Sequence, residues 1–193
     1  MDSRIADNLL REVLEKLMKS IAINLLLLVS IATVSVAQQD KSKRPSPPGQ
    51  AQCTFADGKK VTVDYSRPSM KGRKIYGGLV PWNQEWRTGA NEATTFVTDT
   101  DVTVAGTKVP AGDYTLYTVP AEEGWQLIIS KKTGQWGIPY PGKEFDLARI
   151  PIQSSALKSP VEQFTISFDQ APTQCTLNMD WETTRASAVV DEK

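Results

Sequence analysis

Residues 175–184, CTLNMDWETT, alternate between apolar and polar side chains. The apolar set is Cys175, Leu177, Met179 and Trp181, and the polar set is Thr176, Asn178, Asp180 and Glu182. Successive side chains of a β-strand point to opposite faces of the sheet, so this alternation predicts a strand with one buried and one solvated face. Such half-buried strands are typical of antiparallel sheets.

The same alternation recurs along the preceding chain. It is visible in residues 59–66 (KKVTVDYS), 101–120 (DVTVAGTKVPAGDYTLYTVP), 125–130 (WQLIIS) and 163–169 (QFTISFD). Turns are predicted at Ala105-Gly106, at Gly112 and at Thr133-Gly134, because glycine adopts backbone conformations that other residues avoid. Short strands separated by glycine and proline turns predict an all-β fold: an antiparallel β-sandwich, jelly-roll-like or barrel-like.

The N-terminal region is predicted to be a signal peptide over residues 1–37. Lys16 and Lys19 precede an uncharged apolar run, residues 21–37, that ends in Ser35-Val36-Ala37. A basic region, an apolar region and a small-residue cleavage site together define a secretory signal. We therefore expect export to the periplasm or the extracellular space, with no stable membrane span after cleavage. An uncleaved N-terminal membrane anchor is the alternative, although the run is shorter than the ~20 residues of a usual spanning helix.

The composition of the chain suggests further boundaries. The natural start is expected at Met18, because MKSIAINLLLLVS is a compact signal sequence; the alternative is an amphipathic helix over the first residues. Residues 38–50, QQDKSKRPSPPGQ, are polar and proline-rich, which predicts a disordered linker. A single β-domain is expected over residues 51–186, followed by a C-terminal tail over 187–193.

Charge and histidine content exclude several classes of function. The chain has 22 basic and 22 acidic residues, so nothing in its net charge favours nucleic acid as a partner. It has no histidine, which excludes Ser-His-Asp triads and metal sites built on imidazole. No phosphate-binding glycine loop or dinucleotide motif is present. We expect no metal and no cofactor, and any catalysis would depend on carboxylates, lysine, tyrosine or arginine.

The two cysteines, Cys53 and Cys175, lie near the two ends of the predicted domain. In an oxidising compartment, one disulfide that joins the first strand to the last is the economical interpretation. Two free thiols are the alternative.

A basic, aromatic segment between two predicted strands supplies the candidate ligand-binding residues: Arg73, Trp82, Trp86, Arg87, Asn91 and Glu92. Arginine binds carboxylate or phosphate through two parallel hydrogen bonds, and an indole offers a wall for stacking. The alternative is that the arginines of this segment pair with Asp64, Glu85 and Glu92 to hold an irregular loop in place. We expect Trp125 and Trp181 in the core, whereas Trp82, Trp86 and Trp136 are candidates to reach solvent.

Two carboxylate pairs offer a catalytic alternative. They are Glu85 with Glu92, and Asp180 with Glu182 on the polar face of the 175–184 strand. Residues two apart on one face of a strand are close enough for acid–base chemistry of the kind glycosidases use.

Several motifs resemble those of the domain of unknown function 2911 family. They are VDYSRPSMKGRKIYGGLVPWNQEWRTGANEATTF (63–96), AGDYTLYTVP (111–120), QWGIPY (135–140) and LNMDWETTRASAVV (177–190). The resemblance covers nearly all of residues 45–185 and implies an exported bacterial β-sandwich-like domain. It implies no activity, and it transfers no catalytic residue. Within it, Arg67, Gly72, Arg73, Gly77, Trp86, Arg87, Gly89, Asn91 and Glu92 fall in the central motif.

Three functions remain open. The leading hypothesis is a ligand-binding or accessory module for a small molecule, anionic or carbohydrate. The second is a carboxylate-dependent hydrolase or lyase, and the third is a structural envelope or matrix protein. A cleft that holds both tryptophan and arginine would favour the first.

Overall fold

The computed structural model describes residue 11, residues 14–19 and residues 40–193, and the chain divides into two compact units, residues 1–40 and 41–193. In the first unit, the described residues 11 and 14–19 are helical. The apolar run 21–37 and the expected cleavage site lie outside the described residues. Among the residues that are described, no helix is long and apolar enough to cross a membrane.

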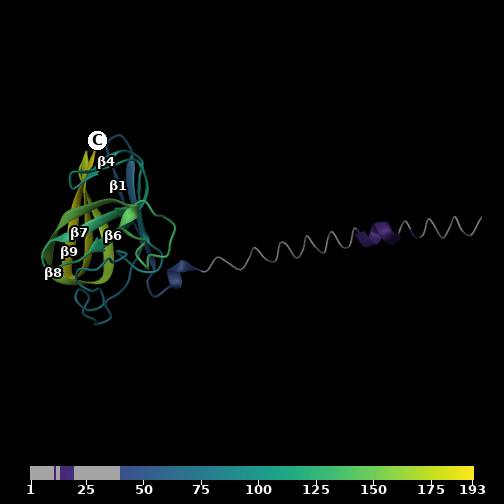
Figure 1. The fold of residues 1–193 in the computed structure, drawn as a ribbon, viewed down its shortest axis with the longest axis horizontal. Helices are drawn as coiled ribbons and strands as arrows, with labels where there is room; N and C mark the ends of the chain where they lie inside the picture. The colour runs from purple at the N-terminus through teal and green to yellow at the C-terminus, as the bar shows by residue number, and fades with distance from the viewer. Residues whose placement is uncertain (1–10, 12–13, 20–39) are drawn as a thin grey trace, which may run out of the picture. The chain divides into compact units, whose positions relative to one another are not determined.

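The second unit is built on one nine-stranded antiparallel sheet (Figure 1). Its strands are β1 (Pro48–Thr54), β2 (Lys60–Ser66), β3 (Thr94–Thr98), β4 (Val102–Val104), β5 (Thr107–Val109), β6 (Gly112–Val119), β7 (Trp125–Ser130), β8 (Asp146–Gln170) and β9 (Gln174–Glu192), with short 3-10 helices η2 (Lys41–Lys43) and η3 (Lys143–Phe145). The strand order is β1-β2-β3-β6-β7-β8-β9-β4-β5, and the sheet is open. The prediction of an antiparallel all-β fold is confirmed.

The hairpin of β4 and β5 shows how local sequence sets this topology. Its turn residues, Ala105 and Gly106, both have positive φ, 43° and 79°. Two positive φ values give a tight turn whose twist matches that of the flanking strands. The predicted turn at Ala105-Gly106 is therefore confirmed.

The sheet extends beyond the boundaries predicted for the domain. The expected linker, 38–50, contains η2 and the start of β1, where Pro48 pairs with Ser66 of β2. Residues 187–192 of the expected tail form the end of β9, where Val190 is buried and pairs with Val104 of β4. In both stretches the sheet is extended by pairing with a neighbouring strand, β2 at Pro48 and β4 at Val190.

Strand β9 bends back on itself near Glu182, whose backbone has a positive φ of 54°. On either side of the bend, Arg185 donates to the Asp180 carboxylate at 2.7 and 2.6 Å, and Ser187 donates to Asn178 at 2.8 Å. In a straight strand, residues five and nine positions apart would be separated by roughly 17 and 30 Å. The bend therefore brings the polar faces of the two halves of β9 together.

Strand β8 connects the two ends of the sheet. Residues 146–152 pair with β7, and residues 153–170 pair with β9. The second half also reaches β2 and the chain that follows it: the Tyr65 hydroxyl of β2 bonds the backbone of Ile166, and Phe164 N donates to the carbonyl of Pro68 at 2.9 Å. The far end of the sheet thus folds over the β1–β2 end, and the core lies between them.

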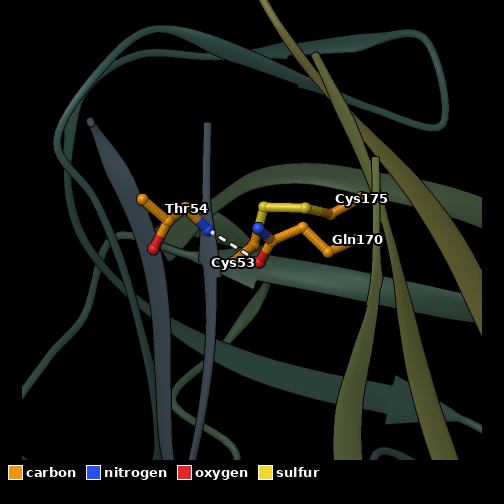
Figure 2. Close-up of a disulfide and its surroundings, with 4 residues drawn as sticks. All are labelled: Cys53, Thr54, Gln170 and Cys175. Atoms are coloured by element: carbon orange, nitrogen blue, oxygen red, sulfur yellow. Dashed lines mark hydrogen bonds between the residues drawn. A yellow bond between two sulfur atoms is a disulfide. The ribbon is translucent and has the colours of Figure 1, made fainter. Parts of the chain in front are cut away.

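A disulfide between Cys53 of β1 and Cys175 of β9 reinforces this closure, and the predicted pairing is confirmed. Figure 2 shows it beside the hydrogen bond from Thr54 N to the Gln170 side chain, which is 3.3 Å long. Both cysteines are fully buried. Buried disulfides of this kind are typical of proteins in oxidising, extracytoplasmic compartments.

Candidate functional site

The segment between β2 and β3, residues 67–93, carries all six candidate ligand-binding residues. Main-chain hydrogen bonds tie its middle to β6: Trp86 N donates to Thr118 O at 2.8 Å, and Thr118 N donates to Trp86 O at 2.9 Å. The Thr88 hydroxyl also donates to the Thr118 hydroxyl at 3.2 Å. Strand β6 therefore fixes the place from which Trp86 and Arg87 project.

An aromatic cluster anchors the same segment to the core. The rings of Trp86 and Trp181 stack with centroids 5.7 Å apart, and those of Tyr76 and Trp82 stack at 5.9 Å. Trp125 and Trp181 are 2% and 1% exposed, which confirms that they are core residues. Trp82 and Trp86 are half-buried, and each has one indole face turned to another ring.

A cavity of about 380 Å³ opens beside the stacked indoles. We call it the arginine cleft; among its lining residues are Arg73, Arg87, Glu85, Trp86, Leu79 and Ile138. Its volume falls within the roughly 300–1,000 Å³ of pockets that hold small molecules.

Arg87 is the half-buried cation of the arginine cleft. Its aliphatic stem lies on Gly137, where an added Cβ would come within 2.6 Å of the Arg87 Cβ and Cδ, so a larger residue would displace the arginine. Its Nη1 donates to the carbonyl of Asn91 at 3.3 Å. Burial lowers the pKa of the guanidinium, yet an arginine stays charged at neutral pH. The cleft thus contains a partly desolvated positive charge.

Arg73 brings a second positive charge to the cleft. Its Nε donates to the carbonyl of Met70 at 2.8 Å, and its Nη2 donates to that of Ser69 at 2.6 Å. Carbonyl oxygens orient a guanidinium without cancelling its charge. Within the described part of the chain, no carboxylate forms an ion pair with Arg73 or Arg87.

The acidic residues that were expected to neutralise these arginines have other partners. Glu85 accepts from Arg149 at 3.0 Å, and Glu92 accepts from Arg44 at 2.9 and 2.8 Å. Asp64 accepts from a glutamine side chain of β1. The alternative prediction, in which Asp64, Glu85 and Glu92 pair with arginines of the 67–87 segment, is therefore wrong.

Arg149 of β8 holds Glu85 as part of a polar cluster at the edge of the cleft. Its Nε donates to Asp146 at 2.7 Å, and its Nη2 also donates to the Tyr140 hydroxyl at 3.0 Å. Burial, followed by the hydrogen bond to Asp146, raises the pKa of Tyr140 to about 12. Burial raises the pKa of Glu85 and the hydrogen bond from Arg149 lowers it, with a net decrease. Glu85 therefore stays ionised and paired with Arg149.

Asn91 and Glu92 belong to a different feature. Glu92 lines a second cavity, of about 310 Å³, together with Arg44 and Lys41. The hydrogen bond from Arg44 is the largest of the effects that lower the pKa of Glu92 to about 2. Asn91 has a φ of 58° and donates to the carbonyl of Ser46 at 3.0 Å. These contacts attach the N-terminal segment 41–47 to the loop.

Trp82 also lies away from the arginine cleft. It lines two open cavities on another part of the surface, together with Ala121 and Glu122. Its indole packs directly on Gly77, which has a φ of 72° and leaves no room for a Cβ. Of the six candidate residues, the structure therefore brings together Arg73, Trp86 and Arg87.

The carboxylate pairs do not form a shared acid–base site. Asp180 is held by Arg185 in two short hydrogen bonds, while Glu182, beyond the start of the bend, accepts from the backbone N–H of Ile75 at 3.5 Å. Glu85 and Glu92 belong to separate ion pairs. Among the described residues, no group of three or more Cys, Asp or Glu side chains is placed to hold a metal ion.

Two lining residues of the cleft, Leu79 and Ile138, were missed by sequence reasoning. They are 46% and 56% exposed although both are large and apolar. Ile138 lies in QWGIPY, one of the quoted motifs, and Leu79 lies in GGLVP, so motif membership was the signal available.

Comparison with known proteins places the chain in a family without assigning it an activity. No functionally curated protein and no solved structure matches it. A family model described as "Protein of unknown function (DUF2911)" matches residues 46–190, which include the whole arginine cleft and both cysteines. The chain belongs to the DUF2911 family.

Proposed function

We propose that this protein is a binding module whose arginine cleft takes a small anionic ligand. The observation that carries the proposal is the pair of guanidinium groups, Arg73 and Arg87, that line one cavity without a carboxylate partner among the described residues. A partly buried charge without a counter-ion raises the energy of the empty site. A bound anion would offset that cost through charge-assisted hydrogen bonds.

The rest of the cleft supports the same function. Glu85 is the acidic residue of its lining, and Arg149 engages it, so its charge is balanced without Arg73 or Arg87. The walls are aromatic and aliphatic, which lowers the local dielectric and strengthens attraction between an anion and the guanidinium groups. We also propose that the bent sheet acts as a sandwich-like scaffold, and that the protein works after export, consistent with the Cys53–Cys175 disulfide.

Thermal unfolding in the presence of small anions tests the proposal. The protein would be produced in an oxidising compartment and heated with acetate, benzoate, glucuronate, phosphate or sulfate, and with neutral glucose as a comparison. A ligand at 100 times its dissociation constant stabilises a fold by about 2.7 kcal/mol, a readable shift in Tm. We expect a shift with at least one anion and none with glucose.

Matched variants identify the site. Arg87→Met and Arg73→Met keep the aliphatic stem and remove the charge, so each should weaken the shift. Lys74→Met removes a cation of the same basic segment that does not line the cleft, and it should leave the shift unchanged. A shift that survives in both arginine variants, or no shift with any anion, would refute the proposed function.

A further inference from the structure

We infer that the ligand of the arginine cleft is a small carboxylic acid with an apolar body, such as a medium-chain aliphatic acid; this inference rests on the proposed function and narrows its ligand. The observation behind it is the position of the exposed apolar side chains. In residues 41–193, the exposed large apolar residues are Leu79, Trp136, Ile138 and Val189. Leu79 and Ile138 both line the arginine cleft, and Trp136 is two residues from Ile138.

Exposed apolar residues that gather at one cavity indicate what the cavity binds. A single exposed leucine is ordinary on a protein surface, whereas apolar side chains grouped beside a pocket are typical of a ligand site. Leu79 is 46% and Ile138 is 56% exposed, so each still has a large area that a ligand could remove from water. The cleft therefore offers an apolar contact and a positive charge to the same molecule.

The aromatic lining argues against a sugar acid as the ligand. A sugar ring binds best on an open indole face, with polar groups around it for its hydroxyls. Here Trp86 has one face on Trp181, at 5.7 Å, and Phe164 and Tyr76 contact it edge-on at 5.0 and 6.2 Å. The apolar body of a ligand would therefore contact aliphatic side chains of the cleft more than an open indole face.

Charge and size complete the description of the ligand. A carboxylate matches the planar fork of an arginine through two parallel hydrogen bonds. The cavity volume of about 380 Å³ is near the lower end of the roughly 300–1,000 Å³ range for small-molecule pockets. It fits a compact acid better than a folded partner or a long peptide.

Titration calorimetry with a series of acids tests the inference. The probes are acetate, hexanoate and octanoate, with glucuronate and octanol as comparisons. Each buried methylene should tighten binding by about fourfold, so two further methylenes give up to about fifteenfold between hexanoate and octanoate. Octanol should bind far more weakly than octanoate, because it carries no charge. Equal affinities for acetate and octanoate within twofold, or tightest binding of glucuronate, would overturn the inference.

Variants separate failure of this inference from failure of the proposed function. Leu79→Ser and Ile138→Ser should flatten the dependence on chain length, so that octanoate binds little more tightly than hexanoate. Val189→Ser, which removes an exposed apolar side chain elsewhere, should leave the full dependence intact. Binding of several anions without chain-length dependence would overturn only the apolar ligand class. Absence of binding by any anion would remove the proposed function as well, and the thermal unfolding of each free variant would verify that it is folded.

Discussion

At the scale of single residues, Glu92 is tied to two cations of the N-terminal segment. Arg44 binds both of its oxygens, and Lys41 lies 3.1 Å from one of them. The pKa of Glu92 is lowered from its usual 4.5 to about 2. A carboxyl group whose pKa is lower in the folded protein than in the unfolded chain stabilises the fold above its unfolded pKa, and this contribution disappears as the pH falls through the folded pKa.

We therefore predict that Glu92→Gln lowers the free energy of unfolding at pH 7 by up to about 1 kcal/mol, a small effect because the pair is partly exposed to solvent. The difference from the wild type should shrink between pH 4.5 and pH 2, where the wild-type carboxylate itself takes up a proton. Urea unfolding at several pH values would measure this. Arg44→Met should show the same pH dependence, since it removes the other half of the pair. A difference that stays constant down to pH 2.5 would contradict the assignment.

The sequence predicted which residues of one segment could form a site, but not which distant residues would pair with them. Arginine and tryptophan in one short segment suggested a binding site, and Arg73, Trp86 and Arg87 of that segment line one cavity. The partner of Glu85 was not predictable, because Arg149 is 64 residues away along the chain and approaches only through the sheet. Nor does any local pattern indicate that Glu92 would bind Arg44, in a stretch whose composition predicts disorder. Pairings of this kind depend on tertiary structure.

At the scale of elements, the bend of β9 is stabilised by an ion pair within one strand. The side chain of Asp180 is 11% exposed, and that of Arg185 is 35% exposed. The Asp180 hydrogen bond raises the pKa of the Arg185 guanidinium, which keeps the pair charged. If the arginine is removed, a nearly buried carboxylate remains without its donor, and the desolvation cost of that group is no longer compensated.

We predict that Arg185→Met lowers the free energy of unfolding by about 1–3 kcal/mol. The matched control is Lys59→Met, which breaks the ion pair between Lys59 and Asp57. The side chain of Lys59 is 50% exposed and that of Asp57 is 40% exposed. An exposed pair of this kind contributes little to stability, because water screens the two charges. Chemical denaturation of both variants gives the comparison. If Arg185→Met cost no more than Lys59→Met, the ion pair would not stabilise the bend.

The strands themselves differ in how far the sequence predicted them. Alternating apolar residues correctly indicated β2, β7 and the first half of β9. Strand β1 was missed at its start, because Pro48 and Gly49 disfavour strands and only their pairing with β2 keeps them extended. The bend of β9 was missed because Glu182, not glycine, adopts the positive φ there. A local pattern predicts the existence of a strand better than its direction.

At the scale of the whole molecule, the disulfide joins residues 122 positions apart. Closing so long a loop restricts the unfolded chain and stabilises the fold by about 5 kcal/mol at most in the chain-entropy model, and typically by less. We predict that the double variant Cys53→Ala/Cys175→Ala loses about 2–4 kcal/mol of stability. Guanidinium unfolding would measure the loss. Reductant should destabilise the wild type to a similar extent and leave the variant unaffected; a loss below about 1 kcal/mol would contradict this role.

The same separation also sets an order of events for the newly made chain. Cys53 emerges from the ribosome or a translocation channel long before Cys175, and in that interval it has no native partner. A lone thiolate can attack an existing disulfide, forming a mixed disulfide with one sulfur and releasing the other as a thiolate. The β1–β2 end also cannot be covered until β8 and β9 arrive, because their residues fold over it. The native disulfide can therefore form only after the last strand has been made, and a chain truncated before Cys175 would leave Cys53 without its native partner.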